Sequence, residues 1–193
     1  MGLPEPGPTP TDDALVTRWI AGDETAFDKL VTRHGPALHG FLKMTLGDSA
    51  AAEDAWSETW VRVVRARSRY VAQGQFRAWL FSIGRRCAKD QSRSIRRRLR
   101  LGAALEEHGA RRVVTSPALR LVRSREARAL DASLQGLKEE HRSVLLLTYR
   151  YDMSSEEVGQ VLGLTGQQVR SRITYARRLL KESLARRGVG DDR

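Results

Sequence analysis

The chain has 193 residues and a formal net charge of +11, with 40% hydrophobic and 30% charged side chains. This composition is typical of one large or two small folded domains and excludes a wholly disordered chain. No apolar run reaches the roughly 18–20 residues of a membrane span, and the first ten residues lack the features of a signal peptide. The single Cys87 excludes an intramolecular disulfide and a cysteine-rich zinc site. We therefore expect a cytoplasmic protein that does not insert into a membrane.

The charge is distributed unevenly along the chain. Residues 1–60 carry ten acidic and four basic side chains, whereas residues 61–100 carry thirteen basic and one acidic. A second basic cluster lies at residues 170–187, which hold seven basic side chains and one acidic. Two basic segments far apart in one strongly basic chain favour a nucleic acid bound at two places over a merely solvated surface.

The first half of the chain predicts helices and no strands. Residues 1–11 hold four of the six prolines and are expected to form a disordered leader. Apolar stripes with a 3.6-residue period then predict a short helix from Asp12 or Asp13, and longer helices over about residues 25–46, 49–70 and 76–98. Gly35-Pro36 is expected to kink the second of these helices. We interpret residues 12–98 as an all-α domain.

The second half predicts another helical unit. Residues 99–122 lose the periodicity and contain Gly102, Gly109 and Ser116-Pro117, which indicates a flexible linker. The periodicity returns near Val122 and predicts a second domain over residues 123–187, followed by a tail at residues 188–193. The predicted fold is therefore all-α, with two small helical domains joined by a flexible linker.

The C-terminal domain contains a helix-turn-helix pattern. Ser154 with Glu157, and Thr165 with Gln168, have the spacing of two capping boxes, and Gly163 falls between the helices that they open. In such a motif the start of the second helix enters the major groove of DNA. Glutamine pairs with adenine and arginine with guanine, while further arginines suit phosphates. The predicted DNA contacts are Thr165, Gln167, Gln168, Arg170, Ser171, Arg172, Thr174, Arg177 and Arg178.

The predicted helix over residues 76–98 has a basic face close to aromatic residues. Phosphate contacts combined with stacking on Tyr70 or Trp79 suit a single DNA strand, because every base has a flat face. Phe76 is interpreted as a core residue. The basic side chains are Arg77, Arg85, Arg86, Lys89, Arg93, Arg96, Arg97 and Arg98.

An acidic cluster of Glu53, Asp54 and Glu58 lies beside Trp56 and Trp60 in the predicted helix over residues 49–70. No histidine has ligand spacing, so we interpret the cluster as a protein-binding surface, with one tryptophan exposed and the other in the core. The sequence has no Gly-rich phosphate loop and no Ser-His-Asp arrangement. We expect no catalytic residue, no metal and no cofactor.

The order of these patterns resembles that of bacterial RNA polymerase sigma factors, in the extracytoplasmic-function (ECF) subfamily of the sigma-70 family. The resemblance covers residues 14–98 and 126–186. The segments that carry it include Ala21-Gly22-Asp23-Glu24, Ala52-Glu53-Asp54, Phe76-Arg77-Ala78-Trp79-Leu80, Glu156-Glu157-Val158 and Ser171-Arg172.

The resemblance implies a promoter-specificity subunit that is not an enzyme and is controlled by an anti-sigma factor. It implies that core RNA polymerase is bound at its clamp helices, and that the flap meets the C-terminal domain. The clamp contacts would be Asp54, Trp56, Ser57, Glu58, Trp60 and Arg62. The helix-turn-helix would read the −35 element. The −10 element would be bound by Arg77, Trp79, Arg85, Arg86, Lys89, Asp90, Arg93, Arg96 and Arg97.

The chain departs from the family pattern at several of these positions. Ser57 stands where the family usually has glutamine, and Arg86 where it has asparagine. Gln167-Gln168 replaces a common Gly-Thr, which predicts an altered −35 preference. Two alternatives stay open: a self-sufficient DNA-binding regulator that uses the helix-turn-helix alone, and a metal-dependent nucleic-acid enzyme built on Glu53, Asp54 and Glu58.

Overall fold

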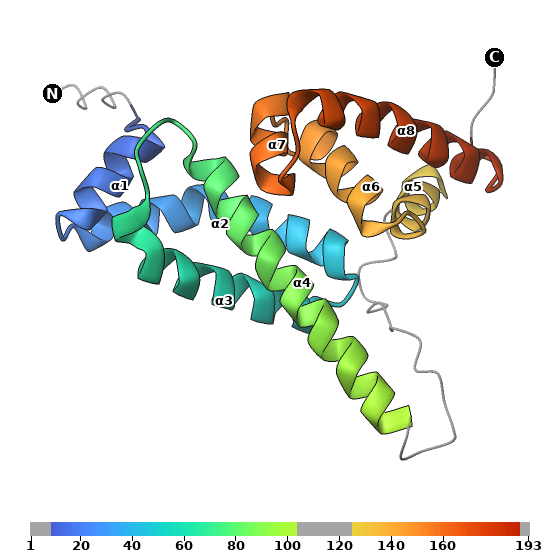
Figure 1. The fold of residues 1–193 in the computed structure, drawn as a ribbon, viewed down its shortest axis with the longest axis horizontal. Helices are drawn as coiled ribbons and strands as arrows, with labels where there is room; N and C mark the ends of the chain where they lie inside the picture. The colour runs from blue at the N-terminus through green and yellow to red at the C-terminus, as the bar shows by residue number, and fades with distance from the viewer. Residues whose placement is uncertain (1–8, 104–124, 190–193) are drawn as a thin grey trace, which may run out of the picture.

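The computed structural model describes residues 9–103 and 125–189, and every regular element within these ranges is helical. The N-terminal half contains α1 (Asp12–Ile20), α2 (Glu24–Leu46), α3 (Ser49–Ala66), the 3₁₀ turn η1 (Arg67–Arg69) and α4 (Phe76–Ala103). The C-terminal half contains α5 (Arg125–Gln135), α6 (Glu139–Leu145), the π-helical turn η3 (Leu146–Arg150), α7 (Ser155–Leu162) and α8 (Gly166–Ala185). Figure 1 shows the two halves lying side by side, and the all-α prediction is confirmed.

The ends of the helices follow from local sequence signals. Thr11, Asp23 and Asp48 cap α1, α2 and α3, and each side chain accepts a hydrogen bond from a backbone amide of the first turn. Gly47 ends α2 in the left-handed conformation, with φ of 72°. Pro36 lies inside α2, which continues through it as one helix.

The predicted leader, linker and tail lie mostly outside the described residues. Residues 1–8, 104–122 and 190–193 of these segments are not described. Residues 99–103, which the sequence assigns to the linker, continue α4 as helix.

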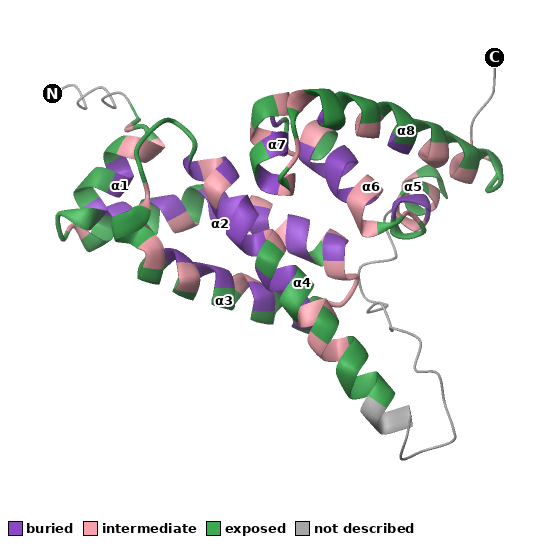
Figure 2. Cartoon of the chain, in the orientation of Figure 1, coloured by how far each residue is buried: buried purple, intermediate pink, exposed green. Residues whose placement is uncertain are grey.

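The N-terminal half packs α1, α2, α3 and the first turns of α4 around a core. Leu15, Leu30, Phe41 and Phe81 are all fully buried in it. Trp19 stacks on Phe27 with ring centroids 4.6 Å apart. The remaining length of α4 extends away from this core, and its side chains are mostly exposed beyond Ala88 (Figure 2).

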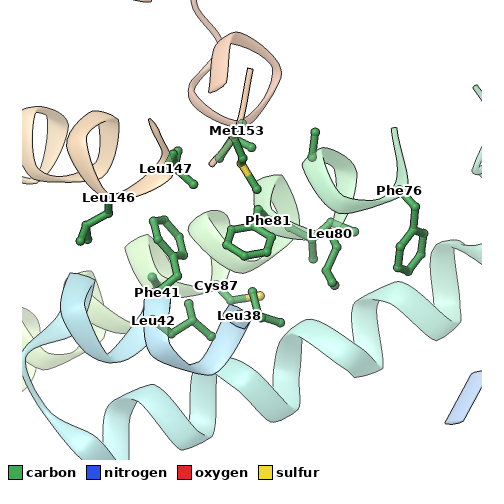
Figure 3. Close-up of a cluster of buried hydrophobic side chains, with 14 of the residues drawn as sticks. Leu38, Phe41, Leu42, Phe76, Leu80, Phe81, Cys87, Leu146, Leu147 and Met153 are labelled. Atoms are coloured by element: carbon green, nitrogen blue, oxygen red, sulfur yellow. The ribbon is translucent and has the colours of Figure 1, made fainter. Parts of the chain in front are cut away.

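The two halves share one continuous hydrophobic core. Leu146, Leu147 and Met153 of the C-terminal half lie over Phe41 and Phe81 of the N-terminal half (Figure 3). Helix α7 packs against α4, and α6 against the end of α2. The sequence predicts apolar stripes on individual helices, and in the structure the buried side chains of both halves join one cluster.

Candidate nucleic-acid interface

The outer part of α4 carries a basic surface that faces solvent. Its members follow one another along a helix that projects from the body of the molecule (Figure 1). The exposed basic side chains predicted there are Arg86, Lys89, Arg93, Arg96 and Arg97. Within residues 9–103 and 125–189, none of these five side chains forms an ion pair with a carboxylate, and such a row of cations suits the backbone of a nucleic acid.

In the first turns of α4, by contrast, the basic side chains are paired with carboxylates of the C-terminal half. Arg77 forms an ion pair with Glu157 of α7, with Nε and Oε1 3.3 Å apart. Arg85 pairs with Glu139 of α6, with Nε and Oε1 3.2 Å apart. These two arginines were predicted as DNA contacts together with the exposed ones, but here they face the C-terminal half.

An aromatic corner lies at the start of α4. Phe76 is 1% exposed and belongs to the core, whereas Trp79 is half-buried with its ring centroid 5.0 Å from that of Tyr70. The Tyr70 hydroxyl donates to Asp13 Oδ1 at 2.7 Å, and the Gly74 amide donates to Asp13 Oδ2 at 2.6 Å. Burial and the Asp13 carboxylate raise the pKa of Tyr70, so its hydroxyl stays protonated as a donor. One carboxylate on α1 thus holds the loop that leads into α4.

Helices α7 and α8 form the predicted helix-turn-helix, and both capping boxes are present. Gly163 ends α7 with φ of 69°, and Val169 and Ala176 bury the inner face of α8. Arg172 is half-buried and lies 3.9 Å from Glu140. The exposed predicted contacts are Thr165, Gln167, Gln168, Arg170, Ser171, Thr174, Arg177 and Arg178. The outer face of α8 is therefore polar, basic and open to solvent.

Two details of α8 modify the sequence-based picture. The carbonyl oxygen Oε1 of Gln168 accepts a hydrogen bond from the Thr165 amide, so the capping box occupies one of its two acceptor positions and fixes the side chain. Tyr175 is 45% exposed and was missed by the motif analysis. Its ring faces His141, with centroids 5.1 Å apart, and the Arg178 guanidinium lies 4.9 Å from its centroid. An aromatic residue four positions after Ser171, on the same helix face, was the signal that could have revealed it.

These residues surround a shallow depression at the start of α8. Its lining is His141, Gln167, Gln168, Ser171, Arg172 and Tyr175. It combines amide, hydroxyl, cationic and aromatic groups, which is the chemistry of contacts to base edges in a groove.

The side chains of the predicted protein-binding surface on α3 differ in their exposure. Asp54, Ser57 and Glu58 face solvent. Trp56 is half-buried and donates its indole N–H to the Gly35 carbonyl. Trp60 is 6% exposed, because its ring packs edge-on against Phe27, so it is a core residue and not part of the surface.

The acidic side chains of this surface are engaged with neighbouring polar groups. Arg62 Nε lies 2.7 Å from Glu58 Oε1, and Arg62 Nη1 lies 3.0 Å from Asp90 Oδ2 on α4. Hydrogen bonds to Glu58 and Asp90 hold the pKa of Arg62 above its ordinary value. Asp54 accepts a hydrogen bond from Gln91 at 3.0 Å. The surface is a charge network that joins α3 to α4.

Little supports a metal or nucleophilic site in the described parts of the chain. Within residues 9–103 and 125–189, no group of three His, Cys, Asp or Glu side chains is placed to hold a metal ion. Cys87 is buried, and burial raises the pKa of its thiol, which keeps it protonated. Among the same residues, no helix is both long enough and apolar enough to cross a bilayer.

Comparison with family models finds two matches in this chain. Residues 30–98 match Sigma-70 region 2, and residues 133–182 match Sigma-70 region 4. The first match covers most of α2 to α4, and the second contains α6 to most of α8.

Relatives and a solved structure give the same picture. The ECF RNA polymerase sigma factor SigE of Mycolicibacterium smegmatis is 32% identical over 188 residues, covering 94% of this chain and 71% of the relative. The sigma factor CnrH of Cupriavidus metallidurans is 32% identical over 190 residues, covering 92% and 96%. The solved structure of CnrH in complex with the cytosolic domain of CnrY is similar with a TM-score of 0.68 and 29% identity, covering 91% of this chain and 97% of that one.

Proposed function

The chain belongs to the ECF RNA polymerase sigma factors, and on this premise we propose that it binds core RNA polymerase, recognises the −10 and −35 promoter elements and helps to open the DNA. The observation that carries the proposal is the order of two helical units in one chain, each with an exposed basic face. Such a subunit supplies recognition and no covalent chemistry, so we assign it no catalytic residue and no cofactor. It acts in the cytoplasm, where RNA polymerase transcribes.

We assign polymerase binding to the exposed side of α3. Asp54, Ser57 and Glu58 lie there, with Arg62 held between Glu58 and Asp90. A surface of fixed carboxylates favours a partner with complementary positive charge and steers its approach. Trp56 adds apolar area at the edge of this surface and fits the role of an anchor.

We assign the −10 element to α4 and to the aromatic corner at its start. The exposed cations Arg86, Lys89, Arg93, Arg96 and Arg97 form a path for the phosphates of one strand. Trp79 and Tyr70 supply flat surfaces at the end of this path, on which an unpaired base can stack. Arg77 and Arg85 extend the path toward this corner once they are free of the C-terminal half.

We assign the −35 element to the outer face of α8. Arg170 and Gln167 lie in the first turn and a half of the helix, where base edges are read in a helix-turn-helix. Arg177 and Arg178 lie farther along and suit phosphates. Tyr175 joins this set as an apolar contact.

We also propose control by an anti-sigma protein that binds this chain directly. The relative CnrH, which the chain matches over nearly its whole length, has been solved with the cytosolic domain of CnrY. A partner of this kind would compete for the surfaces assigned here to polymerase and promoter.

The experiment that tests the proposed function is transcription in vitro. Purified full-length chain and bacterial core polymerase are incubated with a pool of random promoter sequences, and the starts of the RNA products are sequenced. We expect starts that depend on the chain and share two upstream motifs. Binding to DNA without any chain-dependent start would contradict the proposal and favour a self-sufficient regulator.

A charge-reversed variant tests the polymerase surface separately. Glu58→Lys should lower the affinity for core polymerase, because it breaks the pair with Arg62 and reverses a charge on the contact surface. Asp28→Lys is the matched control, since Asp28 is exposed on α2, away from the surface assigned on α3, and is in no ion pair among the described residues. Equal affinity of both variants for the polymerase would remove α3 from the interface.

A further inference from the structure

We propose that the C-terminal half of the free chain is an internal inhibitor that docks on α2 and α4 and occupies Arg77 and Arg85. The inhibitory consequence rests on the proposed function of these two arginines in DNA binding. The docking itself rests on contacts between the halves, which are polar, apolar and helix-capping in kind.

The polar contacts use the donors that a phosphate would need. Arg77 Nε and Nη2 point to the two carboxylate oxygens of Glu157, both at 3.3 Å, and Nη2 also donates to the Asp152 carbonyl at 3.0 Å. Arg85 Nε donates to Glu139 Oε1, and the Arg85 side chain is only 13% exposed. A DNA strand cannot use these groups while the C-terminal half holds them.

Apolar side chains lie between these polar contacts. Tyr151 and Met153, which together we call the apolar plug, pack against the N-terminal half. The ring of Tyr151 lies against Phe41 and Phe81, with centroids 6.1 Å and 5.5 Å apart. Met153 points toward Phe81 and is 4% exposed (Figure 3). Asp152, between them, has a φ of 47°, a conformation that non-glycine residues rarely adopt. The chain is bent here so that both neighbours meet the N-terminal half while the Asp152 carbonyl meets Arg77.

Gly40 on α2 leaves room for the Tyr151 side chain of this plug. A Cβ built at Gly40 would lie 2.9 Å from Tyr151 Oη, and no other described atom outside its own helix turn and chain neighbours comes within 4 Å of it. Position 40 would therefore be open if the halves separated. Among the described atoms considered, a Cβ at this position is opposed only by the docked Tyr151.

The C-terminal half also caps the end of α2. The last carbonyls of a helix have no partner within it and carry partial negative charge. Arg142 Nη2 donates to the Thr45 carbonyl at 2.8 Å, and Gln135 Nε2 donates to the Met44 carbonyl at 3.0 Å. Gln135 in turn holds Arg142 through its own carbonyl and side chain. These hydrogen bonds at the end of α2 thus add a third set of contacts between the halves, distant from α7.

These contacts contribute unequally to the free energy of docking. Ion pairs that are partly exposed are individually weak and are screened by salt. The buried plug supplies most of the attraction, because it removes aromatic and aliphatic surface from water. The ion pairs decide what competes with docking, namely an anionic strand, and they make docking weaker as salt rises.

The test measures the distance between the halves and DNA affinity in the same full-length chain. Dyes are placed on Ser68→Cys in η1 and Lys181→Cys in α8, in a Cys87→Ser background, and energy transfer between them reports docking. Gly40→Leu and the double variant Glu139→Gln/Glu157→Gln should both lower the transfer. Glutamine keeps the capping box at position 157 while removing the charge. The double variant Glu126→Gln/Glu156→Gln is the matched control, because these exposed carboxylates are not paired with the N-terminal half in the structure.

The second readout is binding of a labelled single-stranded oligonucleotide of mixed sequence, followed by anisotropy. If nine molecules in ten are docked, release raises the affinity about tenfold. Lower transfer with higher affinity in Gly40→Leu supports the proposal. If energy transfer is already low in the unmodified chain and Gly40→Leu does not change it, docking is overturned. The proposed function then still stands. Lower transfer without a gain in affinity overturns the inhibition.

One double arginine variant tests the assignment of Arg77 and Arg85 to DNA separately from docking. Arg77→Ala/Arg85→Ala should lower energy transfer like the glutamine variants but should bind the oligonucleotide less tightly than they do. If both double variants bind equally, Arg77 and Arg85 are not DNA contacts, and the assignment of these residues fails while docking stands. Thermal unfolding of each variant checks that the halves remain folded.

Discussion

Single residues set the fine properties of the two faces proposed to bind DNA, and Tyr175 is the most specific example. Its ring is held between His141 and Arg178 on the outer face of α8. A ring fixed in this way can contact a thymine methyl in the major groove with little loss of side-chain freedom. We expect Tyr175→Ala to weaken binding to the −35 duplex by about 1 kcal/mol, roughly fivefold. Anisotropy with the duplex found by transcription measures it.

The control for this substitution is Tyr149→Ala. Tyr149 is also exposed, at 60%, but lies in η3 and not on the recognition helix. Its removal should leave duplex affinity unchanged. The same loss in both variants would show that Tyr175 has no particular contact with DNA.

Asp12 gives the fold a predictable response to acid. Burial opposes ionisation of Asp12, but hydrogen bonds and charges from His34 and Arg33 outweigh it and lower the pKa of the carboxyl. A carboxyl with a lowered folded pKa stabilises the fold above its unfolded value, near 3.9, and this contribution is lost as pH falls through the folded value. Asp12→Asn should destabilise the chain near pH 7 and much less near pH 2. Urea unfolding at both pH values tests this, and an equal difference at both would contradict it.

Among the elements, the helix-turn-helix depends on a close backbone approach. A Cβ at Gly159 in α7 would lie 2.6 Å from the Leu164 carbonyl oxygen of the turn. Gly159→Ala should therefore destabilise the chain by about 1–3 kcal/mol, although alanine favours helix by roughly 1 kcal/mol. Gly166→Ala is the control, since its nearest neighbour would be the end of the Arg170 side chain at 3.5 Å. Thermal unfolding that ranks Gly166→Ala as the more damaging change would reject this explanation.

The elements also show how far local sequence predicts this structure. Caps and glycines lie beside the helices that they delimit, so the helix-turn-helix and most helix starts follow from sequence alone. The helix predicted over residues 49–70 ends at Ala66 with a 3₁₀ turn, and α4 passes residue 98 to reach Ala103. The π-helical turn η3 could not be foreseen, because its Leu146 and Leu147 are fixed by packing against the other half.

The candidate site also has features that local sequence predicts and features that depend on distant parts of the chain. A basic face on a helix is visible in the sequence, and Arg93, Arg96 and Arg97 are exposed as expected. The partners of Arg77 and Arg85 lie 80 and 54 positions away along the chain, so no local pattern reveals them. The sequence left open which of Trp56 and Trp60 lies in the core, because the burial of Trp60 depends on Phe27 of another helix.

At the scale of the whole molecule, the shared core predicts cooperative unfolding. Buried side chains of both halves belong to one hydrophobic cluster. The full chain should therefore unfold in a single transition. Gly40→Leu should weaken the packing between the halves and so split the unfolding into two transitions of smaller enthalpy. Calorimetry tests this, and two transitions in the unmodified chain would contradict a shared core.

Because Glu157 and Arg77 belong to the same polypeptide, docking is a unimolecular equilibrium. Its constant does not depend on how much protein the cell contains, and an inhibitor covalently joined to its target is always present in equal amount. Overproduction of the chain therefore raises the number of undocked molecules only in proportion to the total. A separate inhibitory protein, in contrast, fails once the chain outnumbers it. The fraction of active molecules is thus a property of the sequence, adjustable by substitution at a position such as Gly40 and insensitive to gene dosage.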